Sequence, residues 1–157
     1  MASGSVKAGM QLETYKIDHM EFNVKETLGI LASNSHTDCF VNFRFSFRDV
    51  YKYKVAEKIS YVTGLKIDLT IASKQNQDEP IATGSFVITG LFYTTDELDK
   101  AIEEKLLKFQ APAILFPYLR AAISFTITSA GFSTIILPLV NVNAAAQSME
   151  LKIIEKE

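Results

Sequence analysis

The sequence predicts an α+β fold in which a four-stranded antiparallel sheet carries helices packed on one face. Between residues 10 and 93, apolar and polar side chains alternate in several stretches, as they do in strands that bury one face. After Thr94 the apolar residues recur every three or four positions, which is the spacing of one face of a helix. The later strands are joined by short connections, and these favour antiparallel neighbours.

The composition fits one compact domain. The chain has 157 residues, of which 48% are hydrophobic and 22% charged, and its net charge is −2. This near-average charge argues against an acidic disordered chain and against a basic nucleic-acid binder. Cys39 is the single cysteine, so no disulfide can form within the chain, and a reducing compartment such as the cytoplasm is expected.

The first predicted strand runs from Met10 to Val24. Its apolar residues lie on one parity up to Ile17 and on the other parity from Met20 onward. Because strand side chains alternate between the two faces of a sheet, this slip predicts a β-bulge near Asp18 and His19.

The second predicted strand has the clearest alternation, and it spans Val41 to Arg48. The apolar row consists of Val41, Phe43, Phe45 and Phe47, and the polar row of Asn42, Arg44, Ser46 and Arg48. The apolar parity is expected to continue through Tyr51, Tyr53 and Val55.

Two further strands complete the predicted sheet. The third covers Gly64 to Ser73, and a turn from Lys74 to Pro80 leads to the fourth, from Ile81 to Tyr93. The third strand is expected to bury the row Leu65, Ile67, Leu69 and Ile71.

The helical part begins at Thr94-Thr95-Asp96-Glu97, which has the pattern of a capping box. The first helix is expected to end at Gln110-Ala111-Pro112. Its apolar stripe is Leu98, Ile102, Leu106 and Phe109, with Glu103, Glu104, Lys105 and Lys108 outside the stripe. A second helix is expected from Pro112 or Ala113 to Gly131, a natural C-cap, and a third from Ala144, capped by Asn143.

The chain divides into a central domain and two ends. Residues 1–9 are small and polar, and we expect a disordered tail or the remnant of an expression tag. Residues 10–147 form the predicted domain, and residues 148–157 a short C-terminal tail. The most apolar stretch, from Ala111 to Ala130, is interrupted by two prolines and an arginine. We therefore expect a buried helix and no membrane insertion.

The sequence predicts no catalytic site, no metal and no cofactor. His36 and Cys39 have the spacing of two metal ligands, but zinc sites need three or four, and the other histidine, His19, is distant in sequence. A Cys39 nucleophile with His36 as its base would lack a glycine-rich oxyanion loop. Arg44 and Arg48 lie opposite the aromatic row, so no platform for single-stranded nucleic acid is expected.

The apolar row of the second strand admits two interpretations. Phe43, Phe45 and Phe47 can form part of the core, or they can line a groove for the apolar side chains of another molecule. In the second case, the groove would include apolar residues of the loop between Leu28 and Thr37. Its predicted members are Leu28, Ile30, Leu31, Val41, Phe43, Phe45 and Phe116.

The C-terminal third resembles a known family. The string from Ile114 to Arg120, with Phe116, Pro117, Tyr118 and Arg120, is similar to the N-I-L-F-P-Y-A-R signature of SecB, the bacterial protein-export chaperone. Val140-Asn141-Val142-Asn143-Ala144 is similar to the family's V-N-F-D-A. Thr89 to Phe92 and Met20 to Phe22 resemble the family's G-G-I-F and I-S-F, so the resemblance covers about Met10 to Ala146.

The resemblance implies a SecB-like domain that works as a homotetramer, a dimer of dimers. It also implies an ATP-independent holdase that binds unfolded or nascent polypeptides along apolar grooves and keeps them competent for export or folding. Such a protein is a cytoplasmic chaperone and not an enzyme.

Charge separates this chain from the export members of the family. Export SecB proteins are strongly acidic, and acidic residues on their outer sheet dock the SecA motor. The corresponding positions here are Asp18, His19, Asn23 and Ser85, of which only the first is acidic. Docking to SecA is therefore disfavoured, and a dedicated chaperone for one partner, such as the antitoxin of a toxin–antitoxin system, is the alternative. A carrier of an apolar small ligand is a weaker alternative, since no convergent polar groups are visible.

Overall fold

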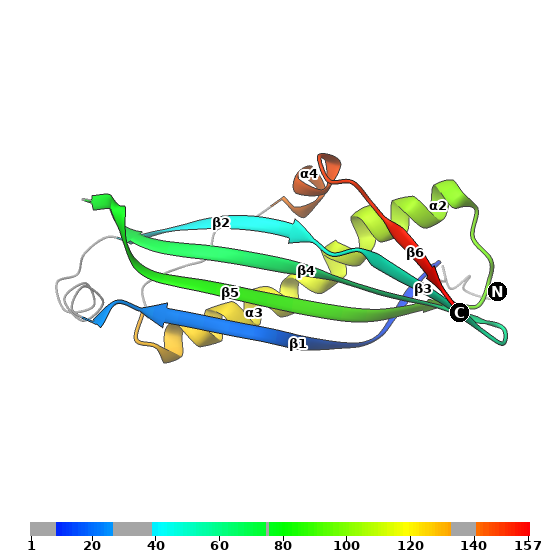
Figure 1. The fold of residues 1–157 in the computed structure, drawn as a ribbon, viewed down its shortest axis with the longest axis horizontal. Coiled ribbons are helices and arrows are strands. Elements are labelled where there is room, and N and C mark those ends of the chain that lie inside the picture. Colours follow the sequence, from blue (N-terminus) through cyan, green and yellow to red (C-terminus); the bar gives the residue numbers. More distant parts are fainter. Residues whose placement is uncertain (1–8, 27–38, 75, 133–140) are drawn as a thin grey trace, which may run out of the picture.

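The computed structural model describes residues 9–26, 39–74, 76–132 and 141–157. These residues form one six-stranded mixed sheet with helices on one face (Figure 1), which confirms the α+β prediction. The predicted number of four strands is wrong. The strands are β1 (Gln11–Val24), β2 (Cys39–Phe47), β3 (Val50–Val55), β4 (Lys58–Ser73), β5 (Asn76–Thr94) and β6 (Ile153–Lys156). The helical segments are α2 (Lys100–Lys105), η1 (Leu106–Gln110), α3 (Ala111–Ser129) and α4 (Val142–Gln147).

Strands β4 and β5 form the centre of the sheet. The strand order is β1-β5-β4-β3-β6, and β2 also pairs with β4. All pairs are antiparallel except that of β3 with β6, which is parallel. β2 and β3 follow the same edge of β4 one after the other, because β2 pairs with residues 65–73 and β3 with residues 58–62.

The bulge predicted in β1 is confirmed. The pairing register of β1 with β5 shifts between Ile17 and His19, where Asp18 is the extra residue. Ile17 therefore pairs with Ile88 and Met20 with Phe86, and apolar side chains on both sides of the bulge face the helices. A second register shift lies between Leu12 and Thr14.

A bulge that the sequence analysis missed separates β2 from β3. Phe47 pairs with Leu65, and Tyr51 pairs with Val62. The chain therefore advances four residues from Phe47 to Tyr51 while β4 advances only three, from Val62 to Leu65. One extra residue inverts the parity of everything beyond it. Lys52 consequently faces the helices, where it bonds Glu103 of α2. The prediction that Tyr51, Tyr53 and Val55 continue the aromatic row is therefore wrong.

Three strand boundaries also differ from the prediction. β4 begins at Lys58 rather than Gly64, and it forms a hairpin with β3. β5 begins at Asn76, so the predicted turn from Lys74 to Pro80 is mostly strand. The last residues, expected as a tail, contain β6, which adds to the outer edge of β3.

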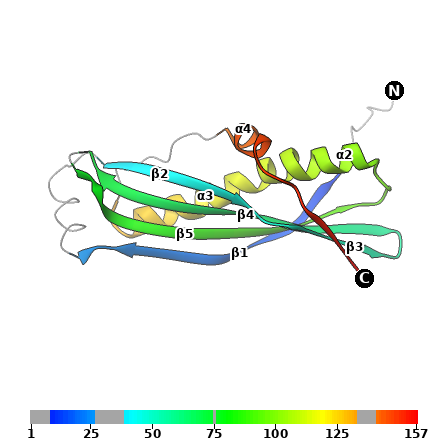
Figure 2. The ribbon, with the colours of Figure 1, turned by 45° about the horizontal axis from the view of Figure 1, so that its top comes forward.

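The helices α2 and α3 form one continuous rod from Lys100 to Ser129, with η1 between them (Figure 2). The predicted break at Gln110-Ala111-Pro112 is therefore wrong. The N–H of Ala111 donates to the carbonyl of Leu106, five residues earlier, which is a π-helical bond. This wider turn precedes Pro112, which has no N–H and would crowd the carbonyl four residues before it.

The predicted start of this rod is also wrong. Thr94 ends β5, and its hydroxyl bonds the backbone of Asp96 rather than capping a helix. The helix begins at Lys100, and the carbonyl of Asp99 accepts the N–H of Glu103. The first regular turn therefore lies about one turn later than the capping-box pattern predicted.

The rod ends as predicted at Gly131, which has a φ of 100°. The N–H of Gly131 donates to Thr128, and the N–H of Phe132 donates to Ile127, which together form a Schellman motif. Buried Phe132 meets Phe22 of β1 edge to face, with 6.1 Å between the ring centroids. This contact fixes the end of α3 over the outer strand of the sheet.

The last helix exists, but it begins two residues earlier than predicted. α4 starts at Val142, and the side chain of Asn141 accepts the N–H of Ala144 at 3.1 Å. Asn141, not Asn143, is therefore its cap.

The core lies between the sheet and α3. Leu115, Leu119, Ile123 and Ile127 of α3 are buried against rows from β4 and β5. The strand residues are Leu65, Ile67, Leu69, Ile71, Phe86, Ile88 and Phe92. By length and composition the rod is apolar enough to cross a membrane, a test that the core helix of a compact protein also passes.

Candidate functional site

The aromatic row of β2 lies on the face of the sheet that carries the helices. Val41, Phe43 and Phe45 are half-buried and pack against the core. The ring centroids of Phe45 and of Phe116 in α3 lie 5.6 Å apart, and those of Phe43 and Phe45 lie 6.4 Å apart. The structure thus gathers four of the predicted groove residues. The other three, Leu28, Ile30 and Leu31, lie outside the described residues.

The position of β2 explains why this row is only half-buried. α3 lies mainly over β1, β4 and β5, so the row runs beside the helix rather than beneath it. Within the described part of the chain, no strand pairs with the outer edge of β2. Phe43 and Phe45 therefore pack against the core and stay partly exposed, and the use of this row as a groove for another molecule stays a prediction.

The signature segment of α3 connects the helix to opposite sides of the sheet. Phe116 reaches Phe45 of β2, whereas Tyr118 stacks on Tyr15 of β1 with ring centroids 4.4 Å apart. Arg120, two residues further along, is half-buried. The segment therefore sets the position of α3 across the width of the sheet.

Close packing fixes the height of α3 above the sheet. A Cβ atom on Gly90 of β5 would lie 2.7 Å from Cδ2 of Leu115, so the absence of a side chain there lets the helix approach. Pro117 lies inside the rod and is exposed. Asn141 caps α4, and Val140 lies outside the described residues.

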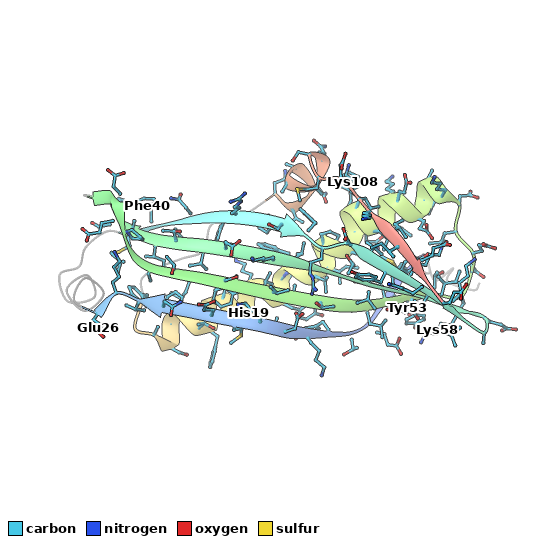
Figure 3. All side chains as sticks on the ribbon, viewed as in Figure 1. His19, Glu26, Phe40, Tyr53, Lys58 and Lys108 are labelled. Atoms are coloured by element: carbon cyan, nitrogen blue, oxygen red, sulfur yellow. The ribbon has the colours of Figure 1, made fainter. Side chains whose placement is uncertain are left out.

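The four positions predicted to correspond to the family's motor-docking residues share the helix-free face of the sheet. Asp18, His19 and Asn23 lie on β1 and Ser85 on β5, and Figure 3 views this face with His19 labelled. An ion pair at 3.1 Å joins Asp18 to Arg48, and the hydroxyl of Thr89 also bonds this carboxylate.

Neighbouring side chains give this face a mixed charge. Glu21 of β1 pairs with Ser85 of β5 across the strands. Its carboxylate lies between His19 and Asn23, 3.5 Å from the His19 ring nitrogen and 3.0 Å from the Asn23 amide nitrogen. Lys66 pairs with Asp68 on the same face at 3.8 Å. The sequence analysis did not single out Glu21, although the parity beyond the predicted bulge would have placed it here.

One acidic residue of the rod is buried, contrary to prediction. Glu103 accepts bonds from the Lys52 ammonium at 2.5 Å and from the Tyr61 hydroxyl at 2.6 Å. Burial raises the pKa of Glu103, but the bonds from Lys52 and Tyr61 outweigh it, so the pKa lies below the ordinary carboxyl value. Burial and the neighbouring carboxylate raise the pKa of Tyr61. Lys52 and Tyr61 both donate to the Glu103 carboxylate, and the cluster faces the sheet, as expected for a structural ion pair.

The buried face of the rod is consequently rotated from the predicted stripe. Glu103 and Leu107 face the sheet, whereas Ile102 is 48% exposed. Ile102, Leu106, Phe109 and Ala113 instead line an open groove of about 530 Å³ on the outer side of the rod. Asn143 of α4 also lines this groove.

The described residues contain no group of three or more His, Cys, Asp or Glu side chains that could hold a metal ion. Cys39 is half-buried at the start of β2, and His36 lies outside the described residues. Of the two residues with metal-ligand spacing, the structure therefore describes only Cys39.

Comparisons with known proteins agree on one family. The family model described as preprotein translocase subunit SecB matches residues 7–150. A protein-export protein SecB from Neisseria meningitidis is 29% identical over 84 residues, 54% of this chain and 56% of its own length. The chain thus spans little more than half the length of such export proteins. An uncharacterized protein of Methanocaldococcus jannaschii is 26% identical over 145 residues, 92% of this chain and 86% of its own length.

A solved structure shows the same fold. The SecB-like chaperone of Mycobacterium tuberculosis, in complex with a ChAD peptide from an antitoxin, superposes with a TM-score of 0.61. The superposition covers 83% of this chain and 90% of that one, at 17% sequence identity. The family match over residues 7–150 and this shared fold lead to one conclusion: the chain belongs to the SecB family.

Proposed function

We propose that this protein is an ATP-independent holdase chaperone that binds extended, non-native polypeptides along β2. The observation that carries the proposal is the half-exposed row of Val41, Phe43 and Phe45, with Phe116 beside it. Membership of the SecB family supports it. The proposal makes the protein a cytoplasmic binding protein and not an enzyme.

The geometry suits an extended chain. Apolar side chains of a client that pack on the row gain about 25 cal/mol per Å² of buried apolar surface, whatever their sequence. The outer edge of β2 adds backbone N–H and C=O groups that an extended client can pair with. Binding of this kind selects unfolded segments, because folded proteins bury both their apolar side chains and their strand edges.

Two exposed surfaces support a homotetramer built as a dimer of dimers. On β1, an outer strand of the sheet, Tyr15, Met20 and Val24 lie on the face that carries the helices and are still 37%, 53% and 37% exposed. The outer side of the rod carries Ile102 and Phe125, which are 48% and 74% exposed. We propose that one copy pairs through β1 and another packs on the rod, which removes both apolar surfaces from water.

Mixed charge on the helix-free face disfavours SecA as a partner. Asp18 is neutralised by Arg48, and Glu21 is flanked by His19 and Asn23. A basic docking segment would therefore meet few free carboxylates. We propose that export through SecA is at most a minor role of this chain.

A dedicated chaperone for one partner, such as an antitoxin, is the second candidate function. The fold that it shares with the Mycobacterium tuberculosis chaperone, which was solved with an antitoxin peptide, favours it. Purification from the native host separates the two: one dominant bound protein supports the dedicated role, and many supports the general role. A small-ligand carrier is disfavoured, because the grooves at η1 and at β1 are open to solvent and the more enclosed one beside Phe47 holds only about 20 Å³.

Suppression of aggregation tests the holdase. Equimolar protein is expected to keep a denatured client soluble, and Phe43→Asp is expected to remove this activity, because a carboxylate repels apolar side chains from the row. Asn42→Asp is the matched control, since Asn42 is exposed on the opposite face of the same strand. If wild-type protein fails to suppress aggregation, the holdase proposal is wrong.

A further inference from the structure

The C-terminal segment of the chain is itself an extended peptide that packs beside the proposed client row. Leu151 and Ile153, two residues apart, pack against the same core as Phe45 and Phe47. Met149 and Leu151 line a groove together with Phe47 at the end of β2. Alternate apolar side chains of this segment therefore pack beside the aromatic row in the way proposed for the side chains of a client.

The segment also adds a strand to the edge that β2 and β3 share. β6 pairs in parallel with β3, from Val50 with Ile153 to Tyr53 with Lys156. The N–H of Val50 donates to the carbonyl of Lys152 at 2.9 Å. Figures 1 and 2 show β6 crossing from α4 to the β3 end of the sheet. One half of the shared edge is thus occupied, and the half formed by β2 has no partner strand in the described part of the chain.

The charged side chains of β6 contribute little to holding it in place. Glu155 lies 3.9 Å from the Lys52 ammonium, but its own side chain is 76% exposed. Lys156 lies 5.5 Å from the centroid of the Tyr51 ring. Lys52 keeps its shorter bond to Glu103 whether or not β6 is present, so release of β6 leaves no buried charge unpaired.

The form of the attachment makes exchange feasible. β6 has only four paired residues, and among the described strands it pairs with β3 alone, so few backbone hydrogen bonds hold it. An arriving segment can form the same backbone hydrogen bonds and bury the same apolar surface. Exchange therefore replaces contacts rather than destroying them.

We propose that the outer edge of β3 is a second acceptor site for an extended polypeptide client, and that β6 occupies it until a client displaces it. The inference rests on the proposed function and adds its regulation. The preferred occupant is an extended segment with alternating apolar side chains and a carboxylate opposite Lys52, as in β6 itself. The free chain thereby shields half of its own binding edge.

Hydrogen exchange of the full chain tests this directly, with reduced and alkylated α-lactalbumin as a permanently unfolded client. When the client saturates the protein, the amides of residues 152–156 are expected to lose protection, and those of β3 to keep it. Protection of both β6 and β3 at client saturation would overturn the proposal and leave the holdase intact. If no client binds, the proposed function itself fails.

A proline variant gives a second readout. Ile154→Pro removes a strand N–H and is expected to release β6, because proline cannot take part in the ladder. Removal of this internal competitor should tighten client binding at least threefold, while Glu157→Pro, beyond the strand, should leave it unchanged. Unchanged affinity in an Ile154→Pro protein whose β6 amides exchange freely would contradict the proposal.

Discussion

At the scale of single residues, the ion pair of Lys52 and Glu103 is the most consequential feature of the interior. Both side chains are largely buried, and the Tyr61 hydroxyl supplies the third member of the cluster. It ties β3 and β4 to the start of the rod. The helical pattern predicts Glu103 on the solvated face, because a charged residue in such a pattern is most often exposed. Only the parity change at the β2–β3 bulge brings a lysine beneath it.

Glu103→Gln is expected to lower the free energy of unfolding by about 3 kcal/mol, because it leaves the Lys52 ammonium buried without its carboxylate. Glu104→Gln, one residue along and exposed, should change it by less than about 0.5 kcal/mol. Urea unfolding measures both. Equal effects of the two substitutions would show that the Glu103 contact contributes nothing.

The same cluster predicts acid sensitivity. The pKa of Glu103 is lower in the folded chain than in the unfolded one, so its contribution is present above the ordinary carboxyl pKa of about 4.3 and is lost as the pH falls through the lowered value. The stability difference between wild type and Glu103→Gln should therefore shrink between about pH 6 and about pH 3. A difference that does not change over this range would contradict the lowered pKa.

At the scale of elements, the side chain of Arg48 connects the edge formed by β2 and β3 to the strands on the far side of β4. Arg48 at the end of β2 reaches over Gly64 of β4 to Thr89 of β5 and Asp18 of β1. Its Cδ would lie 3.2 Å from a Cβ on Gly64. One arginine thus links four strands across the helix-free face, directly beside the bulge that turns the edge.

Gly64→Ala is expected to destabilise the sheet by about 2 kcal/mol, because the added Cβ would lie 2.2 Å from the carbonyl oxygen of Ile88 and force β4 and β5 apart. Thr70→Ala, on the outer face of the same strand, should have less than about a quarter of this effect. Thermal unfolding compares the two. Tolerance of Gly64→Ala without loss of stability would show that the close approach is not required.

Periodicity predicted the elements whose patterns are regular and missed those set by contacts. The parity slip in β1 revealed its bulge because apolar residues flank it on both sides. The extra residue between Phe47 and Tyr51 gave no such signal, since Tyr51 and Tyr53 look equally suitable on either face. Pro112 indicated a helix end, but a π turn can accommodate a proline that a regular α-helical turn cannot. β6 is too short to stand out from a polar chain end.

The part of the candidate site that lies on β2 could be predicted, because the alternation of a single strand specifies it. Val41, Phe43 and Phe45 share a face by alternation alone, whereas their half-burial depends on where α3 lies over the sheet. The place of Phe116 beside them came from the family resemblance. The rotated face of the rod could not be predicted, because Ile102 and Leu107 are equally apolar in the pattern.

At the scale of the whole molecule, the apolar composition is divided among three places. One is the core between α3 and the sheet, a second is the aromatic row of β2, and the third is the set of exposed residues on β1 and the rod. A single copy leaves Phe125 74% exposed and Met20 53% exposed. Such surfaces on one chain are expected at interfaces between copies.

Solution mass tests this expectation. The wild-type chain is expected to form a tetramer, about four times the 17.5 kDa chain mass. Phe125→Asp should reduce it to dimers, because it places a charge in the interface on the rod. Thr83→Asp, exposed on the helix-free face, should leave the mass unchanged. A monomeric wild type at micromolar concentration would contradict the proposed assembly.

The most direct test of the account is to photo-crosslink an unfolded client from positions on β2. A benzoylphenylalanine at Phe43 faces the proposed binding row, and one at Asn42 faces the opposite side of the same strand. We expect strong crosslinking of reduced and alkylated α-lactalbumin from position 43 and little from position 42. Equal crosslinking from both positions, or crosslinking from position 42 alone, would contradict the claim that clients bind along the aromatic row of β2.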